Sequence, residues 1–485
     1  MGWCVKMSAP SRSPKRECSP KRECSRPRPD VDKPNRACDN GRLIPPMRSR
    51  PTSRWIGLFL CALLLVAFAV RFGVTLGLRD IHQADSRISD AREFNAIALN
   101  LASGRGYAVV PGHPTSFRAP GFPLFLAAIY RISYENYVLV YLALSMVGAV
   151  TCLLTYGVAR QLLSEGQARL AGCLAAVYLP HVYSSAVWMS EVLFALCIAL
   201  GLWLLLRALR NSSVWLLAAA GACMGYAALT RPIALLFPVF LAPALFRAAG
   251  PNWGRLIRTT VPFGLAALAV VLPWSLRNYT VYHRLVLIAT NGGSTFYGAN
   301  NDITLHNRAY LGSWIATSYL PGRNLIEAAP DEVSHDQVEW TLGKQWVSTH
   351  VASLPILEVY KLARFWLPDT QSGNRKFVLM QFVAYVPMGL LMGLGLAVLL
   401  RPLRWAASPE WLAVHAILAA NLASTLVFYG SARFRDSITP VLMIYATVGL
   451  TQLAGWLGFR IGQSDSRPAK SDLAQTFSGK PKPGC

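Results

Sequence analysis

The stretch that decides the fold is WIGLFLCALLLVAFAVRFGVTLGL, residues 55–78, which contains one charged side chain, Arg71. About 20 apolar residues in a helix cross the hydrocarbon core of a bilayer, so this stretch can span it. It is too long for a cleavable signal peptide, and it lacks a small-residue cleavage motif. Across the 485 residues, 53% are hydrophobic and 15% are charged, which is typical of polytopic membrane proteins.

Nine further apolar runs follow the first. We expect about ten transmembrane helices, at 55–78, 137–160, 169–186, 188–206, 214–230, 232–247, 259–276, 377–400, 411–430 and 437–459. With a cytoplasmic N-terminus, the arginine-bearing loops RALRNSS and RPLRWAASPE lie inside, as the positive-inside rule requires. The fold class predicted is an all-α polytopic protein, multi-pass in the cell inner (plasma) membrane.

Two long segments then lie outside, and both mix amphipathic patterns with turn residues. Such patterns predict helices in the membrane interface. Within the first, APGFPLFLAAIY at 119–130 is too short to span and contains two prolines, which favours an interfacial or re-entrant helix. The predicted organisation is a basic disordered cytoplasmic tail at 1–54, a membrane module at 55–276 with the outer loop 79–136, an outer (periplasmic or extracytoplasmic) loop at 277–376, C-terminal transmembrane helices at 377–460, and a cytoplasmic tail at 461–485.

The N-terminal tail carries the tandem SPKRECSPKREC, and Met47 is an alternative start of the native chain. The net charge of +23 raises the question of a nucleic-acid partner. The basic residues concentrate in this tail and at the ends of apolar runs, where membrane topology explains them. We therefore expect contacts with membrane lipids and no nucleic-acid partner.

Four arginines at the outer ends of spans are not explained by topology: Arg231, Arg277, Arg433 and Arg435. Positive charge is disfavoured on that side by the orientation bias. Arginine suits phosphate because its planar fork bonds two oxygens at once. The alternative is that these side chains anchor to lipid head groups or snorkel from helix ends.

Acidic candidates lie on the same side. Asp90 is in ISDAREFNAIALNLASGRGY, 88–107, where it could also be the N-cap of a helix. Glu93, one turn later, is interpreted as a solvated or helix-pairing acid. Glu191 opens the fourth span, either near a polar cavity or as a carboxylate favoured by the helix dipole. His181 is near the same end, where an interfacial histidine is the simpler interpretation.

The sequence contains no motif that indicates a nucleotide-dependent enzyme. There is no P-loop, no GxGxxG unit, no GxSxG elbow and no HExxH spacing. A reaction on the outer face would need a donor that is already activated and carried in the lipid.

The motifs resemble those of a known family. DAREFNAIALNLASGRGY, PTSFRAPGFPLFLAAIY, SEVLFALCIAL, ALTRPIALLFP, PWSLRNYTVYHRLVLIATNGGSTFYGANN and ARFRDSITPVLMIYA follow in the order seen in GT-C membrane glycosyltransferases. The resemblance is to the family-39-like members, relatives of protein O-mannosyltransferases and of aminoarabinose lipid A transferases. It extends over residues 55–455. Ala119 and Phe122 depart mildly from the family's second motif, and Glu191 stands where many relatives have Asp.

The resemblance implies a hexosyl or pentosyl transferase that uses a polyprenyl-phosphate-linked sugar. Asp90 corresponds to the family's catalytic acid and Glu191 to its second acid, with arginines near the lipid phosphate. Arg118, in the second motif, and Tyr297, in NGGSTFYGANN, are further candidates. A carboxylate base and a single displacement imply inversion at the anomeric centre.

The identities of the substrates stay open at this point. The acceptor is a hydroxyl or phosphate group on a glycan, a lipid or a protein. No cofactor is certain, and a divalent metal ion stays an open alternative. The rival function is a transporter or flippase for a lipid-linked sugar or oligosaccharide, which would predict charges near span midpoints and two related halves.

Overall fold

The computed structural model describes residues 53–77, 89–133, 136–368, 375–400 and 408–459. Within these ranges the regular structure is helical, with an isolated β-bridge between Ala108 and Pro114 and no strand. The predicted all-α polytopic fold is confirmed for this part of the chain. The expected tails at 1–54 and 461–485 lie outside the described residues, apart from the start of the first helix.

Among the described residues, seven helical segments are long and apolar enough to cross a membrane, so the count of ten is not confirmed. They are α1 (Ser53–Gly77), α5 (Tyr137–Ala159), α8 (Glu191–Asn211), η1 with α10 (Pro232–Leu236 and Phe237–Ala249), α11 (Trp253–Tyr282), η4 with α18 (Gln381–Tyr385 and Val386–Leu399) and α19 (Pro409–Val427). Two helices at other expected spans are α9 (Val214–Thr230) and α21 (Thr439–Trp456). The first of these is apolar but shorter.

The expected span at 169–186 is divided into α6 (Glu165–Val177) and α7 (Leu179–Ala186). Tyr178 between them is extended, with φ −67° and ψ 100°, and Pro180 lies in the first turn of α7. Proline has no N–H and is tolerated in the first turn of a helix, where no partner is needed. Apolar composition therefore predicted one continuous helix, whereas the chain breaks before Pro180 and forms two helices.

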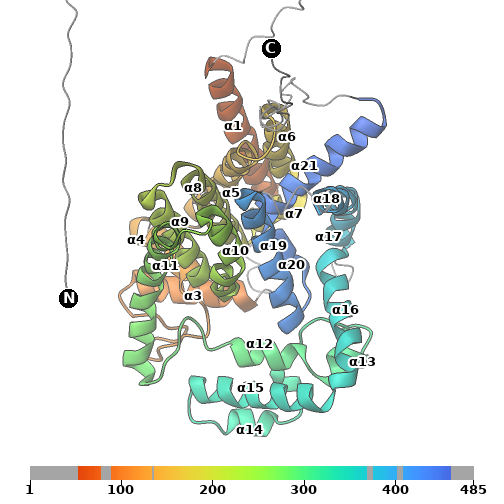
Figure 1. The fold of residues 1–485 in the computed structure, drawn as a ribbon. Helices are drawn as coiled ribbons and strands as arrows, with labels where there is room; N and C mark the ends of the chain where they lie inside the picture. Colours follow the sequence, from red (N-terminus) through yellow and green to blue (C-terminus); the bar gives the residue numbers. More distant parts are fainter. Residues whose placement is uncertain (1–52, 78–88, 134–135, 369–374, 401–407, 460–485) are drawn as a thin grey trace, which may run out of the picture. The chain divides into compact units, whose positions relative to one another are not determined.

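Two further sets of helices are not among the candidate membrane spans. The first expected outer loop forms α3 (Ser89–Ala102) and α4 (Gly121–Ser133). The second forms α12 (Gly292–Ala299), α13 (Asp302–His306), η2 (Thr317–Tyr319), α14 (Arg323–Glu327), α15 (Glu332–Thr349), η3 (Val351–Ser353) and α16 (Leu354–Trp366), which gather beside one another (Figure 1). Because α11 continues to Tyr282, this segment begins later than the predicted residue 277.

Close packing between α18 and α21 depends on two glycines. A Cβ atom on Gly395 would overlap the carbonyl oxygen of Tyr445, and one on Gly449 would overlap the carbonyl of Leu391. Small residues let membrane helices approach closely enough for extensive van der Waals contact. Gly393, two residues earlier on α18, has nothing within 4 Å of its Cβ position.

This pair of positions gives a matched prediction. We expect Gly395→Ala to destabilise the protein by about 1–3 kcal/mol, because the helices must move apart. Gly393→Ala should be neutral or slightly stabilising, since alanine is the better helix former by about 1 kcal/mol. Thermal unfolding of both variants in the same detergent measures the difference. Equal unfolding midpoints for the two variants would show that stability does not depend on the close approach of α18 and α21 at Gly395.

Candidate active site

Asp90 and Arg118 form an ion pair at one end of the ionic cluster. Asp90 lies in the first turn of α3, and Arg118 lies in the loop before α4. The guanidinium Nη2 is 2.8 Å from Asp90 Oδ1, and Nε is 2.7 Å from Glu93 Oε2. The same guanidinium lies over the rings of Phe94 and Phe117, with centroid distances of 5.7 and 5.1 Å. Arg118 is thereby oriented by both charge and aromatic faces.

Glu191 is the buried centre of the cluster. It is the first residue of α8, and its side chain is 4% exposed. Its Oε1 atom is 2.8 Å from Arg231 Nη1 and 2.7 Å from Arg433 Nε. Its second oxygen, Oε2, is buried and accepts a hydrogen bond from no residue in the described part of the chain. A buried carboxylate is tolerable only when it is paired, and here two arginines provide that pairing.

Arg433 connects the two carboxylates. It lies on the short helix α20 (Ala432–Asp436), whose N-cap Ser431 accepts a hydrogen bond from the Arg433 backbone N–H. While Nε contacts Glu191, Nη1 is 3.1 Å from Asp90 Oδ2. The Arg433 side chain is 42% exposed and that of Asp90 is 22% exposed, so both remain accessible from outside. The cluster thus runs from a buried acid to an accessible acid through one guanidinium.

Opposite charges balance within this cluster. Three carboxylates, Asp90, Glu93 and Glu191, face three arginines, Arg118, Arg231 and Arg433. Burial lowers the pKa of Arg433, but the nearby carboxylates of Glu191 and Asp90 outweigh that effect and raise it above its ordinary value. The same balance of burial against Asp90 and Glu93 raises the pKa of Arg118. The guanidinium groups of Arg118 and Arg433 therefore stay charged at any physiological pH.

Aromatic residues that sequence patterns did not single out line the cluster. Phe434 lies beneath Arg231, with 5.3 Å from the guanidinium carbon to the ring centroid. Its ring is 4.8 Å from that of Tyr429, measured between centroids. Burial raises the pKa of Tyr429, so its hydroxyl is protonated beside the ionic groups. Tyr429 lies in the stretch FYGSARFRD, which contains no motif or residue spacing that would have identified Tyr429 as a site residue.

Arg277 is not part of this cluster. It lies within α11, and its Nη1 donates to the carbonyl of Thr115 and to Ser116 Oγ, each at 2.9 Å. Its guanidinium lies 4.8 Å from the ring centroid of Trp274. Arg277 therefore links the loop before α4 to α11.

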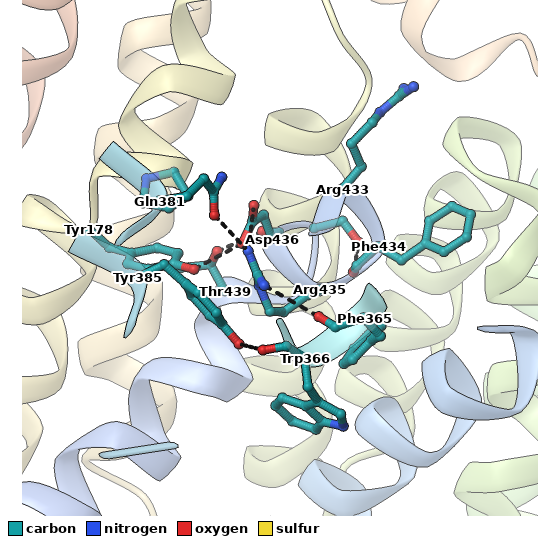
Figure 2. Close-up of polar contacts among 12 residues, drawn as sticks. Tyr178, Phe365, Trp366, Gln381, Tyr385, Arg433, Phe434, Arg435, Asp436 and Thr439 are labelled. Carbon is teal, nitrogen blue, oxygen red and sulfur yellow. Dashed lines mark hydrogen bonds and ion pairs between the residues drawn. The ribbon is translucent and has the colours of Figure 1, made fainter. Parts of the chain in front are cut away.

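Arg435 also lies elsewhere, although it is two residues from Arg433. Its Nε is 3.0 Å from Asp436 Oδ1, and its Nη1 donates to the carbonyls of Phe365 and Leu367. Its guanidinium stacks 3.5 Å from the centroid of Tyr385. Figure 2 shows Arg433 pointing away from this group. Arg435 is fully buried, and each of its side-chain nitrogens has a partner.

Two other sequence candidates are not among the residues of the ionic cluster. His181, on α7, is fully buried near Arg71, and neither of its ring nitrogens has a partner in the described part of the chain. Arg71 itself donates to the carbonyls of Ala175 and Ala176 at 3.1 and 3.2 Å. Tyr297, on α12, donates its hydroxyl to the carbonyl of Pro321 at 2.7 Å. That contact ties α12 to the loop before α14.

The described residues do not fit a divalent metal ion. Among them, no group of three His, Cys, Asp or Glu side chains is placed to hold one. Asp90 and Glu191, the candidate acids, each already receive two arginines. An ion would have to displace guanidinium groups, so no step below is routed through a metal.

Comparisons with known proteins extend this description. Residues 113–276 match the family model described as dolichyl-phosphate-mannose-protein mannosyltransferase. No curated protein matches the chain. The matched residues include Arg118, Glu191 and Arg231, so much of the ionic cluster lies within the match.

A solved structure of an oligosaccharyltransferase shares the fold. The oligosaccharyltransferase of Archaeoglobus fulgidus, tethered to an acceptor peptide, aligns with a TM-score of 0.50 and 12% identity over 84% of this chain and 50% of that one. ArnT from Cupriavidus metallidurans, bound to undecaprenyl phosphate, gives a TM-score of 0.42 and 14% identity over 84% and 80%. The chain spans about half the length of the oligosaccharyltransferase. The resemblance of this chain to the GT-C membrane glycosyltransferases is thus confirmed, by the family-model match and by the fold.

Proposed function

We propose that the protein transfers a sugar from a polyprenyl-phosphate donor to an acceptor hydroxyl or phosphate group on the outer face of the membrane. The observation that carries the proposal is the ionic cluster, in which an accessible carboxylate and an accessible arginine lie 3.1 Å apart beside two further arginines. The matched family description names a dolichyl-phosphate-linked mannose, which supports a lipid-phosphate donor. In this proposal the N-terminus is cytoplasmic and the site faces the periplasm or exterior.

Asp90 is proposed as the general base. The acceptor oxygen attacks the anomeric carbon, its proton passes to Asp90, and the bond from that carbon to the phosphate oxygen breaks. The products are the glycosylated acceptor and the polyprenyl phosphate. A positioned base contributes roughly 10²–10⁴-fold to such a step. Attack opposite the leaving phosphate inverts the anomeric centre.

Arg433, Arg231 and Arg118 are proposed to receive the donor phosphate. The leaving oxygen gains negative charge as the bond breaks, and fixed positive charge there stabilises the transition state. The guanidinium group of an arginine can donate hydrogen bonds to two phosphate oxygens at once. Arg277 and Arg435 are left out of this set because neither pairs with Asp90, Glu93 or Glu191, and both bind other parts of the chain.

Glu191 is a positioning residue in this mechanism. It holds Arg231 and Arg433 together through a single oxygen, which fixes the geometry of the phosphate site. Its second oxygen is buried without a described partner, and in this proposal a sugar hydroxyl donates to it when the bound donor moves the side chains that cover it. Such an unpaired buried acceptor discriminates strongly in favour of ligands that can donate to it.

A reconstituted assay tests the proposal. The full-length protein in proteoliposomes is given polyprenyl phosphates that carry mannose, arabinose or aminoarabinose, together with protein, lipid A and glycan acceptors. We expect transfer from at least one donor, with inversion at the anomeric carbon. Movement of the intact lipid-linked sugar between leaflets without transfer would instead establish the rival transporter function.

A further inference from the structure

A groove opens at the opposite end of the bundle from the ionic cluster. It has a volume of about 960 Å³ and is formed by α1, α5 and α8 with the residues that follow α5. That volume is within the roughly 300–1,000 Å³ of ordinary ligand sites. Apolar side chains make most of the wall, among them Leu60, Leu153, Leu154 and Trp203.

The position of this groove follows from α8. Glu191 is the first residue of that helix, whereas Arg207 and Arg210 are in its final turns. At about 1.5 Å per residue the helix is roughly 30 Å long, which is the thickness of a bilayer core. The groove therefore meets the leaflet opposite to the one that meets the ionic cluster.

The rim of the groove is positively charged. Arg160, Arg207 and Arg210 line it. Arg160 pairs with Glu165, and Arg210 lies 3.3 Å from Glu410. Arg207 makes no ion pair with any described residue, and its guanidinium is 4.3 Å from the ring centroid of Trp203. Within the part of the chain that the structure describes, one arginine on the rim thus has no counter-charge.

A hydrogen-bond acceptor is also unused there. The Gln161 side-chain amide donates to the carbonyl of Trp203 at 3.2 Å, while its Oε1 atom is buried without a partner among the residues the structure describes. A buried acceptor without a donor is costly, so a ligand hydroxyl would be favoured here once the Gln161 side chain turns its oxygen towards the groove, which it lines. The groove thus presents an apolar wall, a positive rim and an acceptor.

We infer that the groove binds one anionic glycerophospholipid of the phosphatidylglycerol type. Its acyl chain lies against the apolar wall, its phosphate contacts Arg207, and a glycerol hydroxyl donates to Gln161 Oε1. Basic pockets between transmembrane helices bind anionic head groups in this way. The chain's own N-terminal segment is a poor occupant, because SPKRECSPKREC would bring positive charge to a positive rim.

Native mass spectrometry of the full-length protein tests this inference, with dioleoyl-phosphatidylglycerol and dioleoyl-phosphatidylcholine as probes. Arg207→Gln should weaken phosphatidylglycerol binding about fivefold, as expected for one arginine beside an anionic head group. Arg258→Gln is the matched control: Arg258 is an exposed arginine near the start of α11 and does not line the groove. It should leave the affinity unchanged.

Undecaprenyl phosphate is the third probe, because it shares the phosphate but would occupy the proposed donor site. Arg207→Gln should leave its affinity unchanged, which separates the groove from that site. The inference is overturned if phosphatidylcholine binds the wild type as tightly as phosphatidylglycerol. It is also overturned if the two arginine variants weaken phosphatidylglycerol equally, or if Arg207→Gln weakens undecaprenyl phosphate as much. A failure of the glycosyl-transfer assay would not affect these results.

Discussion

Replacing Asp90 by asparagine should lower the rate of sugar transfer roughly 10²–10⁴-fold, because the amide cannot accept the acceptor's proton. Asparagine keeps the size of the side chain and an oxygen that can accept from Arg118 or Arg433, which both contact the carboxylate. Accessible ion pairs contribute about 0–1 kcal/mol to stability, so folding should be nearly unaffected. Initial rates in proteoliposomes, with thermal unfolding of the same preparations, measure both effects.

Glu93→Gln is the matched control for Asp90. Glu93 is one turn further along α3 and contacts the same arginine, 2.7 Å from Arg118 Nε, but forms no ion pair with Arg433. Its loss should change the rate by less than about fivefold, the equivalent of one partly exposed ion pair. Full activity of Asp90→Asn would contradict the assignment of Asp90 as base. An equal loss of transfer rate in both variants would show that the two acids serve to orient Arg118 and that Asp90 does not accept the proton.

Replacing Arg433 by glutamine should lower kcat roughly 10²–10³-fold, the usual effect of removing one donor to developing charge. Arg433 contacts Asp90 and Glu191 through different nitrogens. Arg433→Lys should restore only part of the rate, because a single ammonium group cannot reproduce the separate contacts that the guanidinium nitrogens make with Asp90 and Glu191. Steady-state kinetics at saturating donor separates kcat from KM.

Arg92→Gln serves as the control for Arg433. Arg92 is an exposed arginine on α3, two residues from Asp90, and forms no ion pair within the described ranges. It should retain wild-type kinetics. A raised KM for the donor with an unchanged kcat in Arg433→Gln would contradict a transition-state role, because it indicates equal binding of ground state and transition state.

The sequence by itself determined the membrane character of the protein and predicted which acids belong to the candidate site. Runs such as 55–78 are too apolar and too long for a soluble core helix, so composition alone requires a bilayer. The ordered motifs singled out Asp90 and Glu191, which the structure connects through Arg433. The proline effect at Tyr178–Pro180 was not anticipated, because hydropathy counts apolar residues and ignores missing N–H groups.

Only the tertiary structure decided which arginines gather around those acids. Arg433 and Arg435 are two positions apart in ARFRD, yet one reaches Asp90 and Glu191 while the other is buried against Asp436 and Tyr385. Residues two apart on a helix point about 200° away from each other, so neighbouring arginines face different surroundings. Arg118 joined the site for the converse reason: it is distant in sequence from Arg433, but both side chains meet at Asp90. A sequence fixes which charges a chain carries, and packing fixes which of them share a site.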